Sequence, residues 1–230
     1  MLKNSTINLG VIRKIATALD ELNERVVFVG GAVVSLYVND PAADDIRPTK
    51  DIDISIEITS VGELEEIREL LILKGFRQSP EDDVICRFRY QDIKVDVMST
   101  KAIGWAPANP WFGLGFKQLE KIVIEDKIIN ILHLSYFLAT KFSAFNDRGG
   151  NDARVSHDFE DITYILDNRI DIVEEIQKSP KEVKEYLKTE FKKLLNNDNM
   201  KEAMMANLYY ETQIERFTMI KEKLNKILQA

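Results

Sequence analysis

The chain has 230 residues, 45% of them hydrophobic, which is enough for the core of one large domain or of two small ones. Its formal net charge of −7 excludes nucleic-acid binding through bulk positive charge, so contact with a polyanion would need a local basic patch. No apolar stretch approaches the roughly 20 residues that cross a bilayer. No secretory signal is recognisable, and the single cysteine, Cys86, excludes an internal disulfide. We therefore predict a cytoplasmic protein that does not interact with membranes, with Cys86 as a core residue.

The first half of the chain alternates between patterns typical of helices and patterns typical of strands. In chain order, we predict a helix over residues 8–22, a buried strand before the turn Gly30-Gly31, a helix after it, a strand over 51–58, a helix over 61–74 ended by Gly75, and two hairpins with strands at 84–90 and 93–98 and at 121–125 and 128–132. Residues 101–115 contain both tryptophans and predict an ordered loop.

Beyond His133 the pattern is helical to the end of the sequence. We predict helices over residues 135–146, 156–166, 180–196 and 200–228, with Ser135 and Ser156 as the N-caps of the first two. The predicted fold class is α+β. Its α/β core occupies residues 1–132, and a helical domain occupies residues 133–230.

Two aspartates share one face of the strand over 51–58. Asp51 and Asp53 are two residues apart, so their side chains project from the same face, where like charges repel each other. A divalent cation between them would turn this repulsion into attraction, and hard oxygen ligands suit Mg²⁺. The alternative is the end of a strand at which both carboxylates face water.

Two further features favour a phosphate-handling site. Asp96 is an isolated carboxylate on the polar face of the strand over 93–98. Gly30-Gly31 stands where a strand runs into a helix, where backbone N–H groups can hold phosphate, although any tight turn at this place can require glycine. Together these parts predict a site in which metal ions assist a phosphoryl displacement.

The stretches FVGGAVVSLYV, RPTKDIDI and KVDV resemble the core of the polymerase β-type nucleotidyltransferase superfamily over roughly residues 26–98. The resemblance implies a small mixed-sheet core in which Asp51 and Asp53 bind Mg²⁺ or Mn²⁺. Asp96 would complete the metal site and activate the acceptor hydroxyl. It also implies nucleotide binding at Gly30, Gly31 and Lys50. Many members have Gly-Ser at the glycine pair, so a hydroxyl contact to the nucleotide is absent here.

The helical half contains a second group of charged residues. Lys141 and Arg148 are seven residues apart and share a face if the helix continues, and Asp158 and Asp161 are three apart on the next helix. Cations at this place could neutralise triphosphate charge in the transition state. The alternative is a set of surface charges that flank a loop at Gly149-Gly150.

This Lys–Arg stretch and the following Asp-x-x-Asp-Ile helix resemble the AbiEii-type branch, the nucleotidyltransferase toxins of abortive-infection and toxin–antitoxin systems, which extends the resemblance to about residue 170. It implies that Lys141 and Arg148 bind the nucleotide phosphates, and that Asp158 or Asp161 is a catalytic acidic residue. His157 stands where the branch has another basic residue, and neither His157 nor His133 has partners that would indicate zinc.

We thus predict a Mg²⁺-dependent enzyme that moves a nucleoside monophosphate from an NTP to tRNA or another RNA end, with an antitoxin protein as a further partner. One alternative keeps the chemistry and changes the acceptor to an aminoglycoside-type molecule, which suits an acidic protein. Another is a nucleotide-binding protein without catalysis. Trp105 and Trp111 either stack on a base or pack their loop onto the core.

Overall fold

The computed structural model describes residues 3–148 and 152–229, so the predicted Gly149-Gly150 loop lies outside the described residues. The chain forms two compact units. The first contains the residues up to Ser35 together with Asp45–His133, and the second contains Leu36–Asp44 together with the residues from Leu134 on. Whether two domains divided at residues 132 and 133 fold independently stays a prediction.

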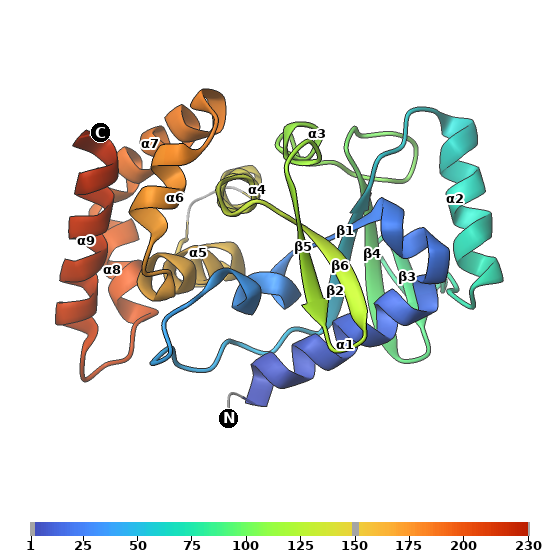
Figure 1. Ribbon diagram of the computed structural model, residues 1–230, viewed down its shortest axis with the longest axis horizontal. Coiled ribbons are helices and arrows are strands. Elements are labelled where there is room, and N and C mark those ends of the chain that lie inside the picture. The colour runs from blue at the N-terminus through green and yellow to red at the C-terminus, as the bar shows by residue number, and fades with distance from the viewer. Residues whose placement is uncertain (1–2, 149–151, 230) are drawn as a thin grey trace. The chain divides into compact units, whose positions relative to one another are not determined.

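The first unit is built on a mixed six-stranded sheet with the order β3-β4-β2-β1-β6-β5 (Figure 1). Its strands are β1 (Val26–Val29), β2 (Asp51–Ile56), β3 (Arg87–Tyr90), β4 (Ile93–Ser99), β5 (Leu119–Ile124) and β6 (Lys127–Leu132). The central pairs β1–β6 and β2–β4 are parallel, whereas β1–β2 and the two outer hairpins are antiparallel. The predicted α+β class and mixed sheet are confirmed.

One face of β2 is apolar and buried, whereas the opposite face begins with two aspartates. Ile52, Ile54 and Ile56 are almost completely buried, whereas Asp51 and Asp53 are only partly buried. The same alternation on β4 buries Val95 and Val97, because successive side chains of a strand point to opposite faces. The sheet therefore carries a polar face over β2 and β4 opposite an apolar core face.

The loop with both tryptophans packs onto the core face. The ring of Trp105 lies 5.6 Å from the ring of Phe88, and its indole N–H donates to Glu65 of helix α2 (Val61–Leu73) at 3.1 Å. Trp111 precedes the short helix α3 (Phe112–Gly115). Trp105 thus packs the loop onto the core, which is one of the two roles that the sequence left open for it.

Several boundaries in the first unit differ from the sequence-based ones. Helix α1 (Lys3–Leu19) begins earlier than predicted and continues as a 3₁₀ helix, η1 (Asp20–Arg25). The helix expected after the glycine pair is also a 3₁₀ helix, η2 (Gly31–Tyr37). Ala32, Val33 and Val34 are all completely buried there. The 3₁₀ conformation of this segment therefore follows from packing on every side rather than from helical periodicity. The turn between β3 and β4 is the predicted one, with Gln91 at a φ of 53°.

The second unit is helical. Its elements are α4 (Leu134–Asp147), α5 (His157–Asn168), α6 (Ile172–Lys178), α7 (Lys181–Asn196), α8 (Asp198–Ala206) and α9 (Gln213–Gln229). Ser156 caps α5 as predicted, by accepting a hydrogen bond from the backbone N–H of Phe159 at 3.3 Å. The predicted cap at Ser135 is wrong, because α4 already begins at Leu134. The long final helix is wrong as well, because Asn197 caps the separate helix α8.

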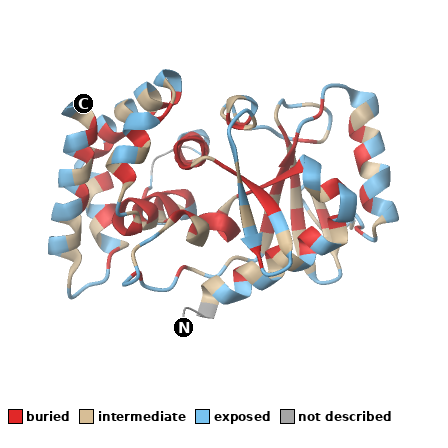
Figure 2. Cartoon of the chain, viewed as in Figure 1, coloured by how far each residue is buried: buried red, intermediate tan, exposed pale blue. Residues whose placement is uncertain are grey.

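Helix α4 is the core element of this unit and is buried along almost its whole length (Figure 2). Its aromatic side chains contact three neighbours: Phe137 stacks on Tyr37 at 4.2 Å, Phe142 meets Phe191 of α7, and Phe145 meets Phe159 of α5. No helix in the described part of the chain is long and apolar enough to span a membrane.

Candidate active site

The predicted carboxylates meet on the polar face of the sheet. Asp53 of β2 is the register partner of Asp96 on the parallel neighbour β4, and Asp51 is the partner of Lys94. Partners in adjacent strands project to the same face, so Asp51, Asp53 and Asp96 form one acidic group. The structure thus brings together residues that are more than 40 positions apart in sequence. Their role as metal ligands stays a prediction.

The first glycine of the turn is required by its contact with Asp53. Gly30 has a φ of +72°, a conformation that residues with a side chain rarely adopt. A Cβ added at Gly30 would overlap the Oδ2 atom of Asp53. The Asp53 carboxylate therefore lies directly against the backbone that follows β1, which places the glycine turn and the acidic group in one site.

The second glycine makes room for an arginine that sequence reasoning missed. A Cβ at Gly31 would lie 2.5 Å from Nη2 of Arg47 and 3.0 Å from Cγ2 of Thr49. The hydroxyl of Thr49 in turn donates to Asn8 of α1 at 3.1 Å. Arg47 thus brings a guanidinium to the predicted phosphate turn, whereas Lys50, next to Asp51, is exposed. The signal in the sequence was a basic residue inside the RPTKDIDI motif.

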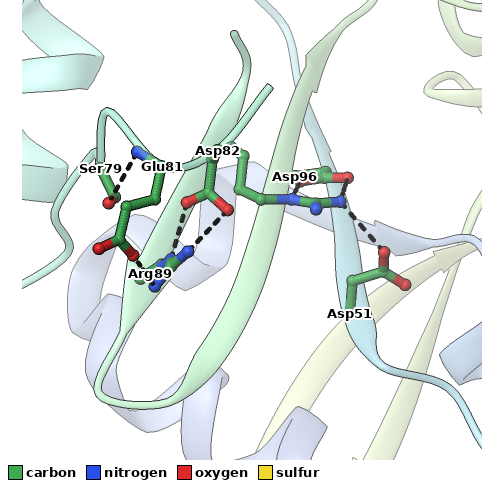
Figure 3. A network of polar contacts seen from close by, with 7 residues as sticks. Asp51, Ser79, Glu81, Asp82, Arg89 and Asp96 are labelled. Atoms are coloured by element: carbon green, nitrogen blue, oxygen red, sulfur yellow. Dashed lines mark hydrogen bonds and ion pairs between the residues drawn. The ribbon is translucent and has the colours of Figure 1, made fainter. Parts of the chain in front are cut away.

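A second arginine that was missed joins two of the carboxylates. Arg87 of β3 donates to both oxygens of Asp96, each at 2.7 Å, and to Oδ2 of Asp51 at 3.2 Å. Figure 3 labels Asp96 and Asp51, the two carboxylates that this guanidinium joins. The Arg87 and Asp96 side chains are each only 14% exposed. The hydrogen bonds to Asp96 raise the pKa of Arg87 further above its usual value, so it is a permanent cation. The pairing of Arg87 with Asp96 could have been deduced from the sequence, because a two-residue turn between β3 and β4 places these two residues opposite each other.

The donor chemistry of this face fits a magnesium ion, although Arg87 already serves as a cation there. Carboxylates of two adjacent strands are the hard oxygen ligands that Mg²⁺ prefers, and Arg87 shows that a positive group is accommodated between Asp51 and Asp96. As the side chains stand, no group of three or more His, Cys, Asp or Glu within residues 3–148 and 152–229 is arranged to hold a metal ion.

Cys86 lies buried near the acidic group. Burial, followed by the negative charges of Asp96 and Asp53, raises the pKa of its thiol to about 11. The thiol is therefore protonated at neutral pH and is a poor nucleophile. This confirms the prediction that Cys86 is a core residue.

The predicted charged residues of the helical half also come together, within the second unit. The ammonium of Lys141 on α4 donates to Asp161 at 2.7 Å and to Asp158 at 3.2 Å, both on α5. Arg148 donates to the other oxygen of Asp158 at 2.6 Å. Lys141, Asp158 and Asp161 are buried, so they are not the surface charges of the alternative interpretation, whereas the Arg148 side chain is 74% exposed.

The two histidines lie outside this buried cluster. His157 is exposed and contacts Glu160 one turn later on α5, at 3.2 Å. His133 lies 3.9 Å from Glu120 of β5. Each of these contacts joins a histidine to a single carboxylate.

Comparisons with known proteins identify the family of the sequence and show related folds. The sequence matches the family described as the nucleotidyl transferase AbiEii toxin of type IV toxin–antitoxin systems over residues 15–226. Among solved structures, the fold is similar to that of an antigenic nucleotidyltransferase-like protein from Paracoccidioides brasiliensis, with 19% identity and a TM-score of 0.52 over 86% of this chain and 91% of that one. The antibiotic-resistance factor ANT(2'')-Ia is also similar, with 20% identity and a TM-score of 0.47 over 84% and 95% of the two chains. No curated protein sequence matches.

The family match spans the acidic face of β2 and β4, the glycine turn and the Lys141 cluster. It thereby confirms the resemblance that those motifs carried and the assignment of the protein as an enzyme that transfers nucleotidyl groups. The chain belongs to the AbiEii nucleotidyltransferase toxin family.

Proposed function

We propose that the protein transfers a nucleoside monophosphate from an NTP to a hydroxyl group of RNA, with Mg²⁺ bound at Asp51 and Asp53. The observation that carries this proposal is the acidic group of β2 and β4 that lies directly against the glycine turn. A metal ion at this place would supply charge neutralisation for the triphosphate. The RNA acceptor is supported by the toxin family rather than by the charge of the protein.

The residues of the first unit have different roles in the proposed reaction. Gly30 and Gly31 let the triphosphate approach the backbone, and Arg47 offers it a guanidinium at the same turn. Lys50, which is exposed, adds a further positive charge next to Asp51. The acceptor oxygen forms a bond to the α-phosphorus as the bond from this phosphorus to the pyrophosphate oxygen breaks, and Asp96 takes the hydroxyl proton.

In the second unit we propose Lys141 and Arg148 as the cations for the nucleotide phosphates. Asp158 and Asp161 hold the Lys141 ammonium in a fixed position, since both carboxylates are buried within hydrogen-bonding distance of it. Either aspartate therefore suits the catalytic acidic residue that the family resemblance implies. A cognate antitoxin and a location in the cytoplasm, where NTPs are available, complete the proposal.

A second acceptor class is favoured by the net charge. At −7 the protein attracts small cationic molecules and repels RNA unless its basic groups are concentrated on one face. An aminoglycoside-type acceptor with several hydroxyls would leave the chemistry at Asp51, Asp53 and Asp96 unchanged. Only the identity of the labelled product distinguishes the two acceptors.

The test is transfer of label from each α-³²P NTP, with Mg²⁺, to total cellular RNA and separately to a panel of aminoglycosides. We expect label on RNA in the size range of tRNA. Asp53→Asn is the matched blank, because it removes a metal ligand with almost no change in volume, and we expect it to lower transfer at least about 1,000-fold. Label on an aminoglycoside alone would show that the acceptor is this small molecule and not RNA. Full activity of Asp53→Asn would remove the metal site from the proposal.

A further inference from the structure

The guanidinium of Arg87 occupies the place at which a cation would bridge two of the proposed metal ligands. It holds both oxygens of Asp96 and one oxygen of Asp51, so it links the acidic side chains of β2 and β4 from the neighbouring strand β3. Arginine cannot lose its proton in this environment, so its positive charge is permanent.

The two contacts of Arg87 are unequal. The pair with Asp96 is bidentate, in register across the hairpin and largely buried, with both side chains 14% exposed. The contact with Asp51 is a single longer bond to a side chain that is 39% exposed. Bidentate, charge-assisted pairs are the stronger kind. An arriving metal ion would therefore displace Arg87 from Asp51 and leave the pair with Asp96 intact.

We propose that Arg87 is a positioning residue that holds Asp51 and Asp96 together in the free enzyme and competes with the divalent cation for Asp51. This inference rests on the proposed metal site. Two cations at contact distance repel each other, so Arg87 keeps metal affinity low until a triphosphate adds further oxygen ligands. The metal then binds together with the NTP rather than before it.

The same strand offers a matched control. Arg89 follows Arg87 by two residues, so it lies on the same face of β3, and it is also ion-paired, with Asp82 at 2.7 and 2.9 Å. Figure 3 shows Arg89 joined to Asp82 and Glu81, with no contact to Asp51 or Asp96. Its substitution removes one charge and the ion pairs with Asp82 and Glu81 from the same strand, while it leaves the contacts of Asp51 and Asp96 in place.

The experiment measures Mn²⁺ binding to the free protein, without nucleotide, by loss of the free-ion signal in electron paramagnetic resonance. We expect Arg87→Gln to bind Mn²⁺ about tenfold more tightly than the natural chain, whereas Arg87→Lys, which keeps the charge, and Arg89→Gln both stay near the natural value. The rise in Tm on addition of Mn²⁺ is a second readout, and it is largest for Arg87→Gln.

The outcomes separate this inference from the proposed function. Unchanged or weaker Mn²⁺ binding in Arg87→Gln, in a chain that binds Mn²⁺ with a non-hydrolysable NTP analogue, overturns the role of Arg87 and leaves the metal site standing. A gain of equal size in Arg87→Lys or Arg89→Gln overturns it too, because the effect would then not come from the charge at Arg87. Absence of Mn²⁺ binding in every chain, even with the analogue, overturns both proposals.

Discussion

At the scale of single residues, each side chain of the site is placed by one close contact. Gly30 allows the Asp53 carboxylate to lie against the backbone, Gly31 leaves room for Arg47, and Arg87 holds Asp96 through both of its oxygens. The contacts of the two glycines join residues that are distant in sequence, whereas the pair of Arg87 with Asp96 lies within one hairpin. The pattern of aspartates indicated the site, but its arginines follow from how the strands pair.

The turn gives the sharpest prediction at this scale. Gly30→Ala forces an alanine into a φ of +72° and its Cβ into the Asp53 carboxylate, so we expect a loss of about 2 kcal/mol or more in the free energy of unfolding. Gly31→Ala meets only the end of a flexible arginine and the methyl of Thr49, and we expect less than about 1 kcal/mol. Urea unfolding followed by circular dichroism measures both. Equal effects would show that Asp53 does not constrain the turn.

The thiol of Cys86 predicts a dependence of stability on pH. Its pKa is raised from 9.0 to about 11 in the folded chain, so between these values the unfolded state ionises while the folded state does not. Stability from this group is present below pH 9 and falls as the pH rises toward 11, by roughly 3 kcal/mol in total. Comparison with Cys86→Ala isolates the effect from lysine and tyrosine titration. Parallel stability curves for the two chains would contradict the raised pKa.

At the scale of elements, a buried ion cluster joins α4 to α5. Lys141 on α4 is paired with Asp158 and Asp161 on α5, and Ser156 fixes the start of α5. A buried pair contributes little net stability, but removal of one partner leaves an uncompensated charge in the core. The cluster therefore couples any function of Lys141 to the integrity of this helix pair.

This coupling predicts a non-additive double mutant. We expect Lys141→Met alone to lower the free energy of unfolding by about 3 kcal/mol, because one buried carboxylate loses its charge partner. The double change Lys141→Met with Asp161→Leu restores most of that loss, since the remaining Arg148 and Asp158 balance each other. Chemical unfolding of the single and double variants measures the coupling. Additive effects would show that the three side chains do not act as one cluster.

The same variants help to separate a role of Lys141 in the reaction from a role in stability. Loss of transfer in a Lys141 variant has two sources, a missing phosphate contact and a disturbed helix pair. The double variant separates them: recovery of both stability and transfer assigns Lys141 to structure, whereas restored stability without restored transfer assigns Lys141 or Asp161 to the reaction.

At the scale of the whole molecule, the chain passes between its two compact units three times, after Ser35, after Asp44 and after His133. The segment Leu36–Asp44 precedes most of the sheet in sequence, but it packs with the helices. Its Tyr37 stacks on Phe137, and the N–H groups of Asn39 and Asp40 donate to the carbonyl of Asn168. A single cut near His133 therefore does not separate the two units.

We expect the chain of residues 133–230 to be less stable than the same chain joined to residues 36–44 through a Gly/Ser linker. The stack and the two backbone hydrogen bonds together correspond to about 3 kcal/mol. Urea unfolding of both chains measures the difference. Equal stability would support an autonomous helical domain that begins at residue 133.

The sequence alone determined the class of the protein and the acidic part of its site. Alternation of isoleucine with aspartate in β2 fixes which side chains leave the core face, and this is a local property of a strand. The same holds for the hairpin at Gln91 and Asp92 and for the cap at Ser156, where neighbours in sequence make the decisive contacts. These were therefore predictable.

Only the tertiary structure decided the parts that depend on distant partners. The conformation after Gly31 and the division of the last helix follow from burial and capping rather than from periodicity. Three contacts require distant strands or helices to meet in space: Arg47 beside Gly31, Arg87 with Asp51, and Lys141 with Asp158 and Asp161. Charge pairing at such distances leaves no period in a sequence, because its energy depends on separation in space and not along the chain.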